Sequence, residues 1–185
     1  MDFAAVFEAA QPYAEYLAAH ATPEQRAKWD ENYAAAVLAD DQKTLIQSFA
    51  REMKVLVLCG AWCGDCMTQC PGLQRIAEQN DRLRLRFVDR DEDPAFADYM
   101  KTCGAARVPN VLFLSEDDQV CGRYGDKTLA KYRTLMAESA AGTCSVGYGE
   151  PEDLRRAVLD EWLGQFERVA YMLRLSGRLR EKHGD

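Results

Sequence analysis

The stretch VLVLCGAWCGDCMTQCPGL, residues 55–73, changes character twice along its length. Its first residues are apolar β-formers, which is typical of a short buried strand, and Gly60-Ala61-Trp62 then predicts a turn. Residues 65–79 that follow are compatible with a helix. The stretch therefore predicts a strand, a turn and a helix. It also contains four cysteines that could bind a metal, form structural disulfides or transfer electrons: Cys59, Cys63, Cys66 and Cys70.

The segments after this stretch predict a mixed sheet. Residues 82–89 alternate arginines with apolar side chains, which indicates a strand that has one face in water or lies near a sheet edge. Asp93 and Pro94 predict the start of a helix that ends around Gly104. Residues 110–124 then read as two strands joined by a Glu-Asp-Asp turn. A parallel pair connected by a helix, closed by a hairpin, gives an α/β class with helices flanking a mixed sheet.

Helical patterns frame this core on both sides. Before it, Pro12 suits a first helical turn, Thr22 to Gln25 forms a capping box, and a further helix is expected over residues 42–51. After it we expect a helix over residues 127–138, a loop over residues 139–150 and a long helix from Pro151 to about Leu175. The long helix carries one apolar stripe, which favours contact with the core over a partner-binding surface. Its members are Leu154, Val158, Trp162, Phe166, Val169 and Leu173.

These patterns divide the chain into a helical extension over residues 1–52, a core over residues 53–138 and a loop with the long helix over residues 139–185. A chain of 185 residues fits one compact domain, so we expect the three parts to pack together.

Charge and cysteine content restrict the function classes. With 30 acidic and 23 basic residues the net charge is −7, which argues against general binding to nucleic acids or anionic membranes. The first twenty residues lack the basic and then apolar profile of a secretory signal, and no apolar run approaches the roughly 18 residues of a membrane helix. We therefore expect a cytoplasmic protein. Thiols stay reduced there and seven cysteines cannot all pair, so a structural disulfide framework is not expected.

The spacing of Cys63 and Cys66 has a specific chemical logic. Cys63 would lie at a helix N-terminus, where free backbone amides and the helix dipole stabilise the reactive thiolate. Cys66 follows one turn later, within reach of Cys63, so it could resolve a mixed disulfide between Cys63 and a substrate. The pattern predicts thiol–disulfide exchange.

Residues 53–125 resemble the thioredoxin superfamily in three motifs: Ala61-Trp62-Cys63-Gly64-Asp65-Cys66, Pro71 five residues later, and Val108-Pro109 before a strand and a hairpin. This resemblance implies a thioredoxin-like fold, a cis peptide bond at Val108-Pro109 and an oxidoreductase in which Cys63 attacks and Cys66 resolves. It also implies that Trp62 walls the site and that Val108, with Pro109, pairs with an extended substrate.

The same resemblance implies the partners. Disulfide-containing or oxidised-cysteine proteins would be the substrates, and a reductase or low-molecular-weight thiol would restore the dithiol. The exchange itself needs no cofactor and no metal.

Two positions depart from the family pattern. Asp65 stands where thioredoxins usually have proline, and its carboxylate should oppose the Cys63 thiolate and make the couple more reducing. Val57 stands where thioredoxins place a buried acid, so that position cannot assist deprotonation of Cys66. Both departures leave the substrate range open.

Two other classes of function compete with an oxidoreductase. The four clustered cysteines could hold zinc or an iron–sulfur cluster, although Cys59 in a strand and Cys70 on a helix would make a poor tetrahedron. Alternatively, the chain could be a binding module, in which polar changes at Trp162 or Phe166 would abolish a complex without unfolding the domain.

Other reactive residues have plainer interpretations. Cys59 reads as a small buried hydrophobe, while Cys70 could pack, protect Cys66 or form an alternative disulfide with it. We expect surface roles for His20 and His183, a solvated turn with an N-cap at residues 89–93, and a solvent-facing Arg107 that could also meet an anionic partner. No chemistry is assigned to Cys103, Cys121 and Cys144.

Overall fold

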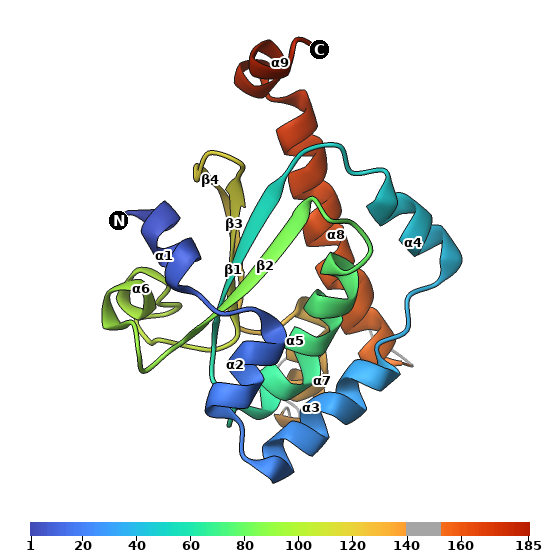
Figure 1. The fold of residues 1–185 in the computed structure, drawn as a ribbon. Coiled ribbons are helices and arrows are strands. Elements are labelled where there is room, and N and C mark those ends of the chain that lie inside the picture. Colours follow the sequence, from blue (N-terminus) through green and yellow to red (C-terminus); the bar gives the residue numbers. More distant parts are fainter. Residues whose placement is uncertain (140–152) are drawn as a thin grey trace.

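A mixed four-stranded sheet forms the centre of the computed structural model, which describes residues 1–139 and 153–185 (Figure 1). Its strands lie in the order β2-β1-β3-β4. β1 pairs in parallel with β2 and antiparallel with β3, which in turn pairs antiparallel with β4. The strands are β1 (Met53–Cys59), β2 (Leu83–Asp89), β3 (Asn110–Ser115) and β4 (Val120–Gly125). The predicted α/β class, with a parallel pair and a closing hairpin, is confirmed.

Helices cover both faces of this sheet. Figure 1 shows α1 and α6 on one side and α5 and α8 on the other. The helices are α1 (Phe3–Ala9), α2 (Tyr13–His20), α3 (Pro23–Ala35), α4 (Asp40–Gln47), α5 (Gly64–Ala77), α6 (Pro94–Tyr99), α7 (Leu129–Ser139), α8 (Leu154–Leu175) and α9 (Gly177–His183).

Local signals account for where most of these helices begin. Thr22 accepts a hydrogen bond from the Gln25 amide in the predicted capping box of α3, and Asp93 caps α6 ahead of Pro94. The prediction was wrong about the end of α6, which stops at Tyr99 rather than near Gly104. Beyond α6 the chain turns through Cys103, whose φ of 50° is left-handed and incompatible with a continuing helix.

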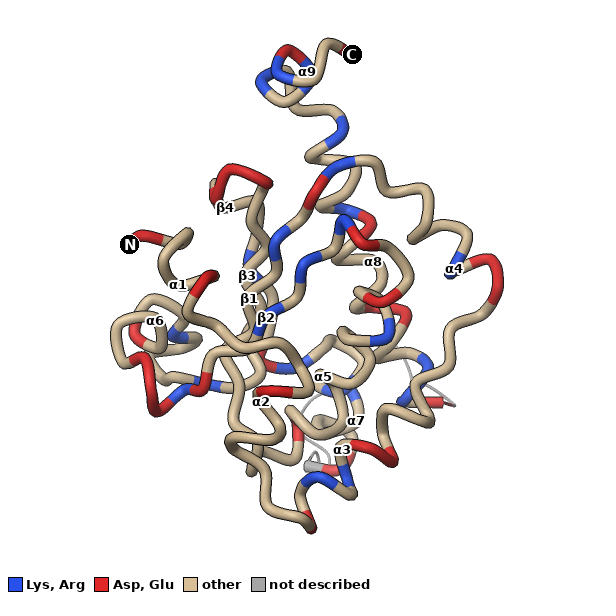
Figure 2. The backbone as a smooth tube through the Cα atoms, in the orientation of Figure 1, with Lys and Arg blue, Asp and Glu red and all other residues tan. Residues whose placement is uncertain are grey.

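β2 lies at the sheet edge, as predicted, and α1 partly covers its polar face, where Arg84 and Arg86 are half-buried. The ring of Phe7 on α1 lies 5.3 Å from the guanidinium of Arg84, 5.6 Å from that of Arg86 and 5.5 Å from the ammonium of Lys54 on β1. These basic positions mark β1 and β2 in Figure 2. The arginines of β2 therefore hold α1 by cation–π contacts.

The apolar stripe of α8 packs into the core, as predicted. Trp162 and Phe166 are fully buried, Val169 and Leu173 nearly so. Because Trp162 and Phe166 are inside, neither can present an exposed docking surface, and the form of the binding-module hypothesis that relied on them is wrong. The predicted helix start at Pro151 and most of the predicted loop lie outside the described residues.

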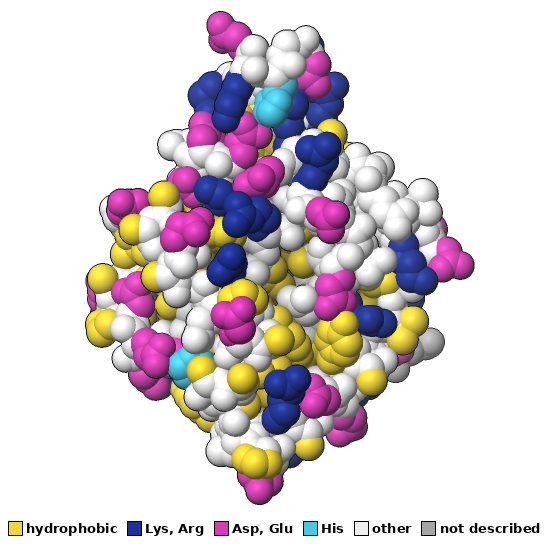
Figure 3. All heavy atoms as spheres, in the orientation of Figure 1, with side chains coloured by type: hydrophobic (Ala, Val, Ile, Leu, Met, Phe, Trp, Pro, Cys, Tyr) yellow, Lys and Arg dark blue, Asp and Glu magenta, His cyan; other side chains and the backbone are white. Residues whose placement is uncertain are grey.

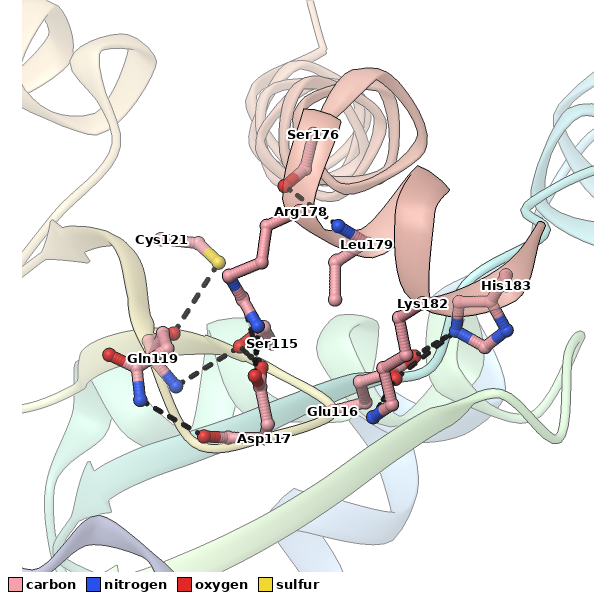
Figure 4. Close-up of polar contacts among 10 residues, drawn as sticks. All are labelled: Ser115, Glu116, Asp117, Gln119, Cys121, Ser176, Arg178, Leu179, Lys182 and His183. Carbon is pink, nitrogen blue, oxygen red and sulfur yellow. Dashed lines mark hydrogen bonds and ion pairs between the residues drawn. The ribbon is translucent and has the colours of Figure 1, made fainter. Parts of the chain in front are cut away.

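The last helix, α9, closes on the turn between β3 and β4 (Figure 4). Arg178 forms an ion pair with Asp117, and Lys182 and His183 contact Glu116 at 2.5 and 2.9 Å. The Arg178 guanidinium lowers the pKa of Asp117 to about 2. The acidic turn and the basic chain end, which the sequence leaves unconnected, are thus charge partners.

Within the described residues, none of the helices combines the length and apolarity that crossing a membrane requires. Figure 3 shows basic and acidic side chains interspersed over the face that it draws.

Candidate functional site

Cys63 and Cys66 lie where β1 passes into α5, as the strand–turn–helix pattern predicts. Cys63 is the N-cap residue of α5, and its amide donates to the Gly60 carbonyl at 2.9 Å, which closes the turn. The buried indole of Trp29 donates to the Ala61 carbonyl at 3.0 Å and so fixes the turn from its buried side. Cys63 is consequently half-buried at the surface, whereas Cys66 is fully buried behind it.

The segment at Val108 and Pro109 faces Cys63. The peptide bond between them is cis, and the Val108 carbonyl oxygen lies 3.5 Å from the Cys63 sulfur. The side-chain amide of Asn110 holds this segment by donating to the Met100 carbonyl at 2.7 Å. Gly125 passes so close that a Cβ atom there would lie 2.6 Å from the Pro109 carbonyl oxygen, at a φ of 146° that L side chains rarely adopt.

Trp62 stands beside Cys63 with 49% of its surface exposed. Its ring lies over Gly60, where an added Cβ would come within 2.8 Å of the ring, and the Arg90 guanidinium lies 4.6 Å from the ring centroid. The indole is thus held by backbone and by a cation, although about half of the residue remains exposed. This placement is compatible with the expected role of Trp62 as a wall of the site.

Asp65 has a partner that the sequence did not reveal. The Lys127 ammonium lies 2.9 Å from the Asp65 carboxylate and 3.3 Å from Asp126. Burial opposes ionisation of Asp126, but a hydrogen bond from Tyr132 and the charge of Lys127 leave the pKa of Asp126 lowered. The Lys127 ammonium partly neutralises the Asp65 carboxylate. The expected effect of Asp65 on the Cys63 thiolate therefore stays a prediction.

Arg107 is tied into the same network. Its guanidinium lies 3.4 Å from the Asp126 carboxylate, while 47% of its side chain remains exposed. Arg107 is therefore an ion-pair partner next to the Val108 segment and not a purely solvent-facing residue.

The structure brings three of the four clustered cysteines together. The sulfur atoms of Cys59, Cys66 and Cys70 all lie within 4.8 Å of one another, and all three residues are fully buried. Within residues 1–139 and 153–185, Cys63 does not belong to this group, because its sulfur faces Val108 instead. The four-cysteine tetrahedron considered for zinc is therefore not assembled.

Neighbouring side chains shift the pKa values of these three thiols in different directions. Burial acts to raise the pKa of Cys59, but interactions with the side chains of Cys66, Cys70 and Tyr16 outweigh burial and lower the pKa to about 5. Burial and the neighbouring Cys59 raise the pKa of both Cys66 and Cys70. The cluster can thus hold one negative charge, on Cys59, with the other thiols as donors.

This charge distribution also affects Cys63. The hydrogen bond with Cys66 and partial burial raise the pKa of Cys63, although the backbone amides of Asp65 and Cys66 act in the opposite sense. The amides of the helix N-terminus therefore favour the Cys63 thiolate, as expected. In the reduced protein the opposing effects of Cys66 and of burial are larger, so the pKa of Cys63 is raised.

The reactivity of Cys63 should consequently rise steeply with pH. Because its pKa is raised, its thiolate fraction at pH 7 is smaller than that of free cysteine, whose pKa is about 8.5. We expect the rate of Cys63 alkylation by iodoacetamide to increase about tenfold per pH unit and to continue rising where free cysteine has levelled off. Cys66→Ala removes the largest cause of the shift and should accelerate alkylation at pH 7. An unchanged rate in that variant would contradict this account.

The remaining candidates have structural partners. A surface role was expected for His20, but the residue is half-buried, and its ring lies 3.0 Å from the Gln11 side chain. In the acidic segment, Asp89 accepts a hydrogen bond from the Tyr16 hydroxyl at 3.1 Å, and Asp93 caps α6 as predicted. Cys103 is exposed and Cys121 half-buried, whereas Cys144 lies outside the described residues.

Comparison with known proteins gave the following similarities. A family model described as Thioredoxin matches residues 10–137, a range that includes helices α2, α3 and α4. No curated protein sequence matches the chain.

Two solved structures are similar over nearly the whole chain. A protein of unknown function from Pseudomonas aeruginosa has a TM-score of 0.69 and 16% identity, covering 91% of this chain and 96% of that one. An HIV epitope scaffold has a TM-score of 0.70 and 15% identity, covering 91% and 97%. At these identities the two structures support the fold alone.

Proposed function

Since the chain belongs to the thioredoxin family, whose model matches most of its length, we propose that it is a thiol–disulfide oxidoreductase that uses Cys63 and Cys66. Cys63 attacks a substrate disulfide and forms a mixed disulfide. Cys66 then attacks the Cys63 sulfur and releases the reduced substrate, so that the two electrons of the dithiol pass to the substrate.

The observation that carries this proposal is the placement of the two sulfurs. Cys63 is half-buried at the N-terminus of α5, where the amides of Asp65 and Cys66 favour its thiolate, and Cys66 lies fully buried one turn further along the same helix. A substrate can reach the first sulfur but not the second, which is the order that attack and resolution require.

The raised pKa of Cys63 supports the reductase direction. A thiol with a strongly lowered pKa stabilises the reduced protein and makes its disulfide an oxidant. The hydrogen bond with Cys66 and burial raise the pKa of Cys63, so the reduced form lacks that stabilisation. The couple should therefore donate electrons readily.

The surroundings of Cys63 support an extended polypeptide as substrate. The Val108 carbonyl next to the Cys63 sulfur can pair with a substrate amide, and the exposed part of Trp62 offers an apolar wall. The proposed substrates are proteins with disulfides or oxidised cysteines. The proposed compartment is the cytoplasm, where a reductase or a low-molecular-weight thiol can restore the dithiol.

A redox titration tests the proposal. Metal-checked protein is equilibrated in dithiothreitol buffers of defined potential, and free thiols are alkylated and located by mass spectrometry. We expect Cys63 and Cys66 to convert together at a potential near or below about −270 mV, the value of thioredoxin. Cys63 and Cys66 that stay reduced at every potential would reject the oxidoreductase and favour a binding module.

A further inference from the structure

Cys59 and Cys70 form a second pair of thiols in contact with the active-site pair. Their sulfur atoms lie 3.8 Å apart, and each lies within 4.8 Å of the Cys66 sulfur. Cys59 ends β1, and Cys70 follows Cys66 by one turn on α5, so two elements of the core bring the three sulfurs together. The active-site chemistry proposed above uses only Cys66 of this cluster.

The four sulfurs make a continuous path from the surface to the core. The Cys66 sulfur lies within 4.8 Å of the Cys59 and Cys70 sulfurs, and interaction with Cys66 is the largest cause of the raised pKa of Cys63. Among the described cysteines, Cys66 belongs both to the active-site pair and to the buried group of sulfurs. A disulfide formed at the surface has a route inward through Cys66.

We propose that Cys59 and Cys70 are a second, buried dithiol that takes over the disulfide formed by Cys63 and Cys66. This inference rests on the proposed function. With this second dithiol the fully reduced chain stores four electrons instead of two. It can then reduce two substrate disulfides before it must itself be reduced again.

The transfer consists of two balanced exchange steps. First, the Cys59 thiolate attacks the Cys66 sulfur of the Cys63–Cys66 disulfide. A bond forms between Cys59 and Cys66, and Cys63 leaves as a thiolate at the N-terminus of α5. Second, Cys70 attacks the Cys59 sulfur while its proton passes to Cys66, which leaves as a thiol. The net result is a Cys59–Cys70 disulfide and a regenerated pair at Cys63 and Cys66, with no change in charge or proton number.

Burial supports this end state. Cys59 and Cys70 are fully buried, and a charge in such a place is costly unless it is well paired. The transfer removes the negative charge from the core, and the Cys63 thiolate that it releases lies half-buried at the start of α5, where it can take up a proton from water. A disulfide left in the core is neutral and needs no hydrogen bonds. A metal bound by several thiolates would instead leave net charge inside.

The test maps disulfides in the wild-type chain. Reduced, metal-checked protein is oxidised in steps with oxidised dithiothreitol, quenched in acid, unfolded and alkylated. Trypsin cannot separate these cysteines, because residues 55–74 contain no lysine or arginine. Chymotrypsin after Trp62 and cyanogen bromide after Met67 leave Cys59 in one fragment, Cys63 with Cys66 in the next, and Cys70 in the third.

We expect two stages. The middle fragment loses its two free thiols, and on further oxidation a cross-link joins the fragments of Cys59 and Cys70. Reduced wild type without a recycling system should reduce two equivalents of a disulfide substrate, and Cys70→Ala one equivalent, a twofold difference. Cys121→Ala is the matched control, because Cys121 lies outside the cluster, and it should keep two equivalents.

The outcomes separate this proposal from the proposed function. If Cys63 and Cys66 form their disulfide while Cys59 and Cys70 stay fully alkylatable, the relay is overturned and the oxidoreductase stands. If no disulfide forms in any fragment, both fail. A Cys59–Cys70 link that forms as fast in Cys66→Ala as in wild type overturns the route through Cys66. Thiols of Cys59 and Cys70 that are blocked until zinc is chelated overturn the relay in favour of a metal site.

Discussion

Cys63→Ser should lose disulfide reduction almost completely, with turnover falling at least about 10³-fold to the level of the uncatalysed exchange. Cys63 is the half-buried sulfur of the pair, whereas Cys66 is fully buried, so no other thiol of the site can make the first attack on a protein substrate. Serine is close to cysteine in size, but its hydroxyl stays protonated at neutral pH and cannot form a disulfide. The measurement is the rate of insulin disulfide reduction with dithiothreitol as electron donor.

Cys66→Ser provides the matched experiment. It retains the attacking sulfur but removes the resolving one, so mixed disulfides with substrate proteins should accumulate and run as larger species without reductant. The melting temperatures of both variants should show that they remain folded. Activity of Cys63→Ser within about tenfold of wild type would assign the first attack to another thiol and reject the mechanism.

Trp162→Ala should destabilise the protein by about 3–5 kcal/mol. Trp162 is fully buried between α8 and the core, its ring packs edge-on to Tyr124 at 5.3 Å, and its indole nitrogen donates to the Gln69 side chain at 3.0 Å. Alanine removes most of the buried apolar area and the donor together. Because typical domains have about 5–15 kcal/mol of stability in total, the variant should unfold at markedly lower urea concentration.

Trp162→Phe separates the two contributions. A smaller aromatic ring is kept, but the buried Gln69 oxygen loses its donor, so we expect a smaller loss of about 1–3 kcal/mol. Urea denaturation followed by circular dichroism measures both variants. If Trp162→Ala changed the free energy of unfolding by less than about 0.5 kcal/mol, α8 would not be packed as described, and its apolar stripe would be available for a partner after all.

Local signals account for the part of the fold that was predicted. The apolar run of β1, the turn at Trp62 and the cap residues Thr22 and Asp93 act over a few residues, and each lies where it was expected. Alternation placed β2 at the sheet edge, because a strand with one polar face is disfavoured at the centre of a sheet that helices cover on both faces. The end of α6 was mispredicted because the left-handed turn at Cys103 has no strong sequence signal.

The sequence by itself determined the class of fold and the succession of elements that carries the candidate site. These elements are a strand that ends in a turn, Cys63 at a helix start and Cys66 one turn later. These features depend on residue spacing and on backbone preferences that neighbouring residues impose. Only the tertiary structure decided which distant groups meet. Lys127 pairs with Asp65, Cys59 meets Cys70, and α9 neutralises the turn between β3 and β4. The physical reason is that such contacts depend on strand register and on how helices pack against the sheet, and no local pattern along the chain specifies either.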